Sequence, residues 1–234
     1  MTNNLKFSEK VISFYKRNEF TGTLPNRFDI INPFSMNPET VRVSNAFYQK
    51  FYHDHCQRKF IIGINPSRHG AGVTGVPFTD TKRLFSECGI EMKSAHTHEI
   101  SSLFMYDMIQ QFGGAKVFFK KFYINSPFPF AIIRKTNIGT WLNANYYDDK
   151  QLFDAVKPYM VQCLNTQIQI GLDTDEVYIL GKKNADFIKK INREEGLFKK
   201  LIVLEHPRFI QQYKSKEKQL YIDKYLQAFS RITN

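Results

Sequence analysis

The chain has 234 residues, 42% of them hydrophobic, which suits a single domain with a sizeable core over residues 1–234. The 33 Lys and Arg residues exceed the 22 Asp and Glu residues, so the formal net charge is +11, which favours a polyanionic partner such as nucleic acid over a basic protein without one. Three cysteines without a Cys-x-x-Cys pair speak against a disulfide framework or a cysteine-based metal cluster. No run approaches the ~18–20 apolar residues of a membrane span, and the N-terminus lacks a signal-peptide core. We therefore expect a soluble, cytoplasmic protein with no membrane contact, associated with the nucleoid if its source is prokaryotic.

Hydrophobic spacing and end signals predict an alternation of helices and strands. Pro158 falls inside one of the helices, where a kink or break is expected. The strands are nearly continuous apolar runs, which is typical of a parallel sheet covered on both faces. The sequence thus predicts an α/β fold, a three-layer α/β/α sandwich with a central four-stranded parallel sheet. The predicted elements are helices over 5–17 and 39–56, a strand over 58–64, helices over 80–88 and 100–112, a strand over 118–125, a helix over 148–170, a strand over 176–180, a helix over 183–191, a strand over 201–205 and a helix over 215–232.

The segment 63–78 is rich in Gly and Pro and follows the first strand directly. A loop in this place is where α/β proteins hold ligands. Residues 70–75 match Gly-x-Gly-x-x-Gly, but they lie about eight residues past the strand and do not form its turn into a helix. We therefore reject a dinucleotide site. A phosphate-binding P-loop is rejected as well, because Gly181-Lys182-Lys183 lacks the required hydroxyl.

Three predicted strands end in polar residues, namely Asn65, Asn125 and His206. Because the carboxyl ends of parallel strands lie along one edge of the sheet, we expect these side chains to converge, with Phe78 joining them from the loop. Two amides, an imidazole and an aromatic face suit the edge and the face of a nucleobase. Neither a carboxylate pair nor a metal-ligand spacing is present, so no metal or cofactor is expected. Taken singly, each residue has a plainer explanation: a turn, a strand end, a structural histidine or a core phenylalanine.

Together these residues resemble the uracil-DNA glycosylase superfamily, within it the branch of single-strand-selective monofunctional uracil glycosylases. The first motif of that branch is matched by Gly63-Ile64-Asn65-Pro66 and Thr74-Gly75-Val76-Pro77-Phe78. Its late His-Pro motif is matched in Leu204-Glu205-His206-Pro207, and its base-reading Asn in Tyr123-Ile124-Asn125-Ser126-Pro127. The resemblance covers about residues 35–215 and implies an enzyme that flips uracil out of DNA and leaves an abasic site.

The resemblance also implies roles for individual residues. Asn65 would orient the attacking water and His206 would stabilise negative charge on the departing base, so these two are the expected catalytic residues. Phe78 would stack on uracil and Asn125 would pair with its N3–H and O4. Gly63, Ile64 and Ser67 would complete the pocket.

Two departures from the branch stand out. Ser67 replaces the usual Gly, at a position where uracil-specific relatives carry a Tyr that blocks the methyl group of thymine. After His206-Pro207 the usual Ser-Pro-Arg is replaced by Arg208-Phe209-Ile210, and the resemblance implies that this segment would enter the duplex. The residues expected to contact DNA are Arg68, His69, Pro207, Arg208, Phe209, Ile210 and Lys214.

The sequence therefore favours a monofunctional uracil-DNA glycosylase that acts as a monomer on single- or double-stranded DNA. One alternative is a non-catalytic nucleic-acid-binding protein that keeps the fold and the pocket. A weaker alternative is a hydrolase of small nucleotides, which the basic charge disfavours.

Overall fold

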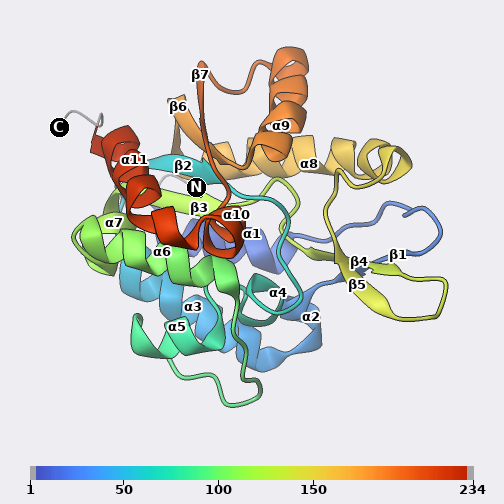
Figure 1. Cartoon of the computed structure of the whole chain (residues 1–234), viewed down its shortest axis with the longest axis horizontal. Coiled ribbons are helices and arrows are strands. Elements are labelled where there is room, and N and C mark those ends of the chain that lie inside the picture. Colours follow the sequence, from blue (N-terminus) through green and yellow to red (C-terminus); the bar gives the residue numbers. More distant parts are fainter. Residues whose placement is uncertain (1–3, 231–234) are drawn as a thin grey trace.

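The computed structural model describes residues 4–230, and its centre is a four-stranded parallel sheet (Figure 1). The strand order is β3 (Phe122–Asn125), β2 (Arg58–Ile62), β6 (Leu172–Leu180) and β7 (Lys200–Leu204). In the register, Ile62 lies opposite Asn125 on one side and Ile179 on the other, so the carboxyl ends of these strands are aligned. The predicted α/β sandwich with four parallel strands is confirmed.

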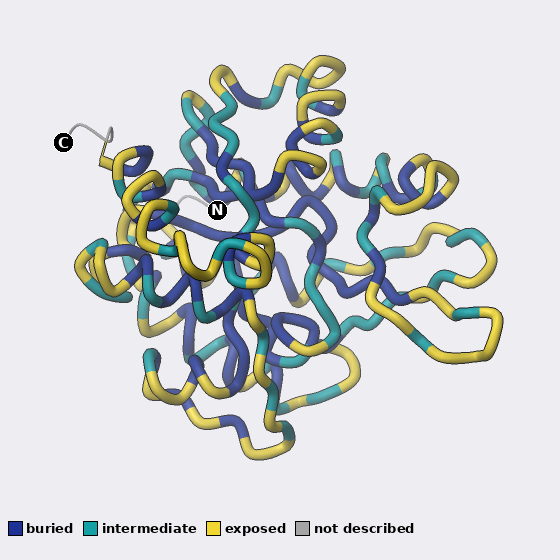
Figure 2. The backbone as a smooth tube through the Cα atoms, in the orientation of Figure 1, coloured by how far each residue is buried: buried dark blue, intermediate teal, exposed yellow. Residues whose placement is uncertain are grey.

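Helices cover both faces of this sheet. On one face, Phe122 of β3 and Tyr178 of β6 contact Phe229 of α11 (Lys218–Ser230), and α6 (Ile100–Gln111) and α7 (Ala115–Lys121) lie on the same side. On the other face, Tyr123 contacts Phe7 of α1 (Phe7–Arg17), and α8 (Lys150–Gly171) and α9 (Lys182–Glu195) complete the layer. Helix α3 (Pro38–Tyr52) packs against α1 and α7. Figure 2 shows the buried backbone concentrated between these layers.

A second, antiparallel sheet lies beside the first and was not predicted. Its order is β1 (Phe28–Ile31), β4 (Ala131–Lys135) and β5 (Trp141–Ala144) (Figure 1). Five short helical segments join the larger elements: α2 (Pro33–Met36), α4 (Ala71–Thr74), α5 (Thr81–Ser86), α10 (Pro207–Tyr213) and the 3₁₀ turn Ser215–Glu217.

Several predicted boundaries need correction. The strand expected over 118–125 begins only at Phe122, because the residues before it form the end of α7, whose Phe118 and Phe119 pack into the core. Pro158 does not break α8, which runs on through Gly171. The helix predicted over 39–56 ends at Tyr52. Residues 231 and 232 of the last predicted helix lie outside the described residues.

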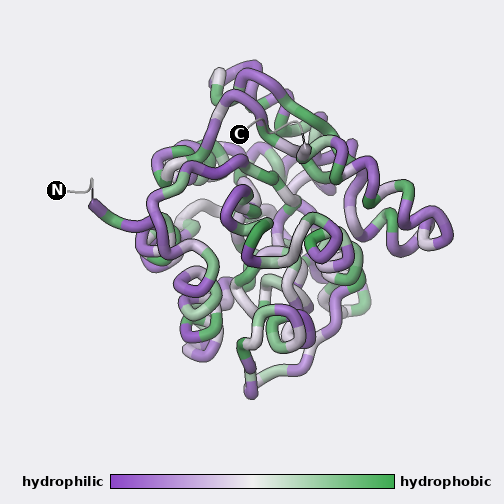
Figure 3. The backbone as a smooth tube through the Cα atoms, turned by 90° about the vertical axis from the view of Figure 1, so that its left-hand side faces the viewer, coloured by the Kyte–Doolittle hydropathy of each residue, from purple (hydrophilic) through white to green (hydrophobic). Residues whose placement is uncertain are grey.

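Hydrophilic and hydrophobic residues alternate along the outer helices in Figure 3. None of the helices within residues 4–230 is both long enough and apolar enough to cross a lipid bilayer.

Candidate active site

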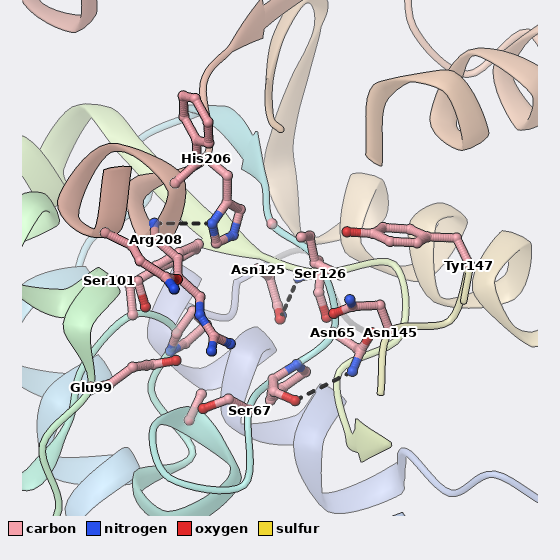
Figure 4. A pocket seen from close by; sticks show the side chains of 18 of the residues that line it. Asn65, Ser67, Glu99, Ser101, Asn125, Ser126, Asn145, Tyr147, His206 and Arg208 are labelled. Atoms are coloured by element: carbon pink, nitrogen blue, oxygen red, sulfur yellow. Dashed lines mark hydrogen bonds between the residues drawn. The ribbon is translucent and has the colours of Figure 1, made fainter. Parts of the chain in front are cut away.

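A pocket of about 300 Å³ opens at the carboxyl edge of the parallel sheet (Figure 4). Asn65, Phe78, Asn125 and His206 all line it, although they come from three strand ends and a loop. Gly63, Ile64 and Ser67 line it too, so every residue predicted for the base pocket is brought together. Among residues 4–230, no group of three or more His, Cys, Asp or Glu side chains is placed to hold a metal ion.

The loop after β2 folds so that the Phe78 ring lies against the end of that strand. A side chain at Gly63 would place its Cβ 3.0 Å from Cε2 of Phe78, so glycine permits this close approach. Phe78 itself has φ of +53°, a left-handed conformation that costs a non-glycine residue about 1–2 kcal/mol. Hydrogen bonds from Thr74 to the Thr79 carbonyl at 2.6 Å and between Thr79 and Tyr106 at 2.9 Å hold the turn. The strain is therefore located at the aromatic wall of the pocket.

Asn65 is anchored by the backbone that follows β5. Its Nδ2 donates to the carbonyl oxygens of Ala144 at 2.9 Å and Pro66 at 3.3 Å, and its Oδ1 accepts from the Tyr146 N–H at 3.0 Å. The buried Tyr146 hydroxyl donates in turn to Asn184 at the start of α9. Both N–H groups of the Asn65 amide are occupied, which leaves one lone pair of Oδ1 for a molecule in the pocket.

Asn125 lies at the end of β3 and is only 2% exposed. Its Oδ1 accepts from the Ser126 backbone N–H at 2.8 Å, a contact drawn in Figure 4. The remaining lone pair of the oxygen and the NH₂ group give this amide both an acceptor and a donor.

His206 follows β7 and caps α10 (Figure 4). Its Nδ1 accepts from the Arg208 backbone N–H at 3.1 Å, so in the neutral ring the proton resides on Nε2. Desolvation in the pocket, assisted by the Arg208 charge, lowers the pKa of His206 to about 4. The ring centre lies 5.7 Å from that of Phe78. The imidazole is thus a neutral hydrogen-bond donor in the lining of the pocket.

Several pocket residues were not predicted from the sequence, among them Glu99, Tyr147 and Tyr213. Glu99 lies at the pocket wall near Ser67 and Ser101, and desolvation raises the pKa of its carboxyl. Tyr147 also lines the pocket, with the Lys183 ammonium 4.8 Å from the centre of its ring. Tyr213, which is 68% exposed, stands at the rim. A capping Glu and two of 12 tyrosines carry no sequence signal that separates them from ordinary surface or core residues.

The expected DNA-contacting residues fall into three sets. Arg208 and Phe209 line the pocket, and Phe209 is 43% exposed. Pro207 and Ile210 are the buried residues of α10, so the expectation that Ile210 enters a duplex does not fit its place in the core. The others, Arg68, His69 and Lys214, do not line the pocket: Arg68 donates to the Trp141 carbonyl at 2.7 Å and to His69 at 3.0 Å, and Lys214 pairs with Glu217 at 2.9 Å.

The pocket lies at the carboxyl edge of a parallel sheet and is lined by an aromatic ring, two amides and a neutral imidazole. This lining defines a protein that holds a flat heterocycle. The family model of the Uracil DNA glycosylase superfamily matches residues 50–230. Among solved structures, "WT Pedobacter heparinus SMUG2" superimposes with a TM-score of 0.95 at 46% sequence identity, covering 97% of this chain and 98% of that one. A comparison with curated proteins gave no match.

The chain therefore belongs to the Uracil DNA glycosylase superfamily. It is an enzyme of the uracil-DNA glycosylase type, and the resemblance drawn from its motifs is confirmed.

Proposed function

We propose that this enzyme is a monofunctional glycosylase that flips uracil out of DNA, hydrolyses the N-glycosidic bond and leaves an abasic site. The observation that carries the proposal is the convergence of Asn65, Phe78, Asn125 and His206 on one pocket. A base inside a duplex cannot reach such a pocket, so the nucleotide must leave the stack first.

Phe78 and Asn125 recognise the base in this proposal. The ring of Phe78 provides a stacking face, and the strained turn that holds it is formed before the base arrives. The Asn125 amide accepts from N3–H of uracil and donates to O4. Cytosine presents the reverse pattern at these two positions, so the same amide disfavours it.

His206 stabilises the leaving group. As the bond to the sugar breaks, negative charge develops on the uracil ring and its O2 becomes a stronger acceptor. A neutral His206 lines a desolvated pocket and carries its proton on Nε2, where one hydrogen bond to developing charge contributes about 2.7–4 kcal/mol.

Asn65 holds the attacking water. An amide does not remove a proton near neutral pH, so Asn65 positions the water for attack on a sugar with oxocarbenium character. Among the described residues, those that line the pocket include neither lysine nor cysteine. Without an amine nucleophile beside the sugar, no lyase step follows, and the abasic site is the product.

The rim of the pocket contacts the DNA. Arg208 and Phe209 lie where the nucleotide enters, and we propose that the Phe209 ring fills the space left by the flipped base. Arg68, His69 and Lys214 remain candidate phosphate contacts on the surrounding surface, consistent with the net charge of +11. We propose that the protein acts as a monomer.

The test is incubation with oligonucleotides that carry one uracil, single- and double-stranded, followed by alkali. Wild type should produce strand breaks, and His206→Ala should slow excision by about 10²–10³-fold. His96→Ala, at an exposed histidine outside the pocket, is the matched control and should excise uracil as wild type does. DNA binding without strand breaks by wild type would instead favour the non-catalytic alternative.

A further inference from the structure

Asn125 is also held by a buried residue outside the pocket. Its Nδ2 donates to the Tyr123 hydroxyl at 2.7 Å, and Tyr123 is fully buried. Tyr123 does not line the pocket. We propose that Tyr123 is a positioning residue that fixes the Asn125 amide in the orientation that reads uracil. This inference rests on the proposed function and adds to it a determinant of specificity outside the pocket.

A phenol both donates and accepts, so the direction of the bond between Tyr123 and Asn125 decides which end of the amide is held. The buried hydroxyl of Tyr15 on α1 interacts with the Tyr123 hydroxyl. Tyr15 also receives a hydrogen bond of 3.4 Å from Tyr48 on α3. The 2.7 Å bond runs from Nδ2 to the Tyr123 oxygen, so the phenol is the acceptor and the Asn125 amide presents its nitrogen to it.

All three phenols keep their protons throughout the working range. Burial raises the pKa of Tyr15 to about 12 and raises the pKa values of Tyr48 and Tyr123 well above their usual range. The chain of hydroxyls therefore stays neutral, and the direction of its hydrogen bonds does not change with pH near neutrality.

The oxygen of the Asn125 amide is held in the same orientation by a second hydrogen bond. Oδ1 of Asn125 accepts from the Ser126 N–H, so a flipped amide would place two N–H groups against each other there and leave the Tyr123 oxygen without its donor. One lone pair of Oδ1 and one N–H of Nδ2 remain for the base, matching N3–H and O4 of uracil. A flipped amide would match cytosine instead.

Removal of the hydroxyl alone should leave the packing of residue 123 in place. The ring of Tyr123 lies 5.4 Å from Phe7 and 6.0 Å from Phe60, and these contacts do not involve the oxygen. Tyr123→Phe therefore isolates the hydrogen bond. Tyr178→Phe is the matched control, since its buried hydroxyl bonds Glu176 at 2.7 Å on the opposite face of the sheet.

The decisive experiment compares the single-turnover rate of uracil excision, the KM for DNA and the side-chain amide signal of Asn125 in ¹⁵N NMR. For Tyr123→Phe we expect the excision rate to fall about 2- to 10-fold, as one buried hydrogen bond implies, with KM unchanged. The Asn125 NH₂ signal should shift and exchange faster with solvent. Tyr178→Phe should change none of these, and Tyr15→Phe should act in the same direction as Tyr123→Phe by a smaller factor.

A Tyr123→Phe protein with the wild-type excision rate and an unmoved Asn125 signal would overturn the inference. So would a loss confined to KM. If Tyr123→Phe does not fold, Tyr15→Phe decides the matter by the same measurements. Failure of the proposed function looks different, because wild type itself would then excise no uracil while the NMR signal would still report the bond between Asn125 and Tyr123.

Discussion

The pKa of His206 gives the sharpest quantitative prediction. The ordinary value for histidine is 6.5, and desolvation with the nearby Arg208 charge lowers it to about 4 in the folded protein. At about 1.4 kcal/mol per pH unit, the difference corresponds to an upper bound of about 3 kcal/mol, reduced where solvent reaches the ring. The folded pKa lies below the unfolded one, so as the pH falls the unfolded state takes the proton first. The contribution of His206 to the free energy of unfolding is therefore fully present above pH 6.5 and is lost as the pH falls from 6.5 to about 4.

The assay is urea unfolding of wild type and of His206→Asn at pH 7 and at pH 5. Asparagine does not titrate, so the stability of wild type relative to the variant should decrease by about 1–2 kcal/mol between these two pH values. The imidazole signals of His206 in NMR should show no midpoint near 6.5, and the excision rate should fall only as the pH approaches about 4. Equal stability differences at the two pH values, with a His206 midpoint near 6.5, would refute the argument that the pocket keeps this ring neutral.

Three further substitutions test the pocket. Gly63→Ala would place a methyl group 3.0 Å from the ring of Phe78, so we expect uracil excision to fall about 10-fold in single-turnover assays while the melting temperature changes little. Asn65→Asp would turn a carboxylate toward the Ala144 carbonyl that Nδ2 now bonds at 2.9 Å, and urea unfolding should show a loss of about 1–3 kcal/mol. Desolvation raises the pKa of the Glu99 carboxyl, so its ionisation above the unfolded pKa of ~4.3 destabilises the folded protein. Glu99→Gln should therefore be more stable than wild type at pH 8 but not at pH 4. An equal gain in stability at both pH values would show that this carboxyl is not desolvated.

The parallel sheet could be predicted because its strands are short runs of apolar residues followed by polar turns. Phe60, Ile61 and Ile62 are all fully buried, as a strand covered on both faces requires. The antiparallel sheet gave no such signal. Trp141–Ala144 is largely exposed, and the first strand of that sheet, Phe28–Ile31, pairs with β4 about a hundred residues later in the chain. Pairing between such distant segments depends on tertiary contacts that local periodicity does not record.

The pocket residues at strand ends were predictable because polar residues follow apolar runs, and Phe78 was predictable from its motif, whereas Glu99 and Tyr147 were not. Glu99 enters the pocket through the turn before α6, where the buried Asp80 carboxylate accepts from the Glu99 backbone N–H at 2.7 Å. No local sequence pattern predicts the contact between Asp80 and Glu99. Tyr123 illustrates the opposite difficulty: within an apolar strand it is indistinguishable from a core residue, and its hydroxyl gains a role only through Asn125 two positions later.

The strand order also explains how residues on separated strands reach one pocket. β3 and β2 are neighbouring strands with Ile62 opposite Asn125, so Asn125 and the segment after Ile62 lie side by side. β7 lies beyond β6, and His206 can cross that distance only if the end of β6 leaves room. Gly181 follows β6 with φ of +98°, its N–H bonds the Leu204 carbonyl at 2.7 Å, and a Cβ there would lie 3.4 Å from Cβ of His206. A side chain at this position would be strained by the left-handed φ and would lie in van der Waals contact with His206, so glycine after β6 relieves that strain beside the imidazole.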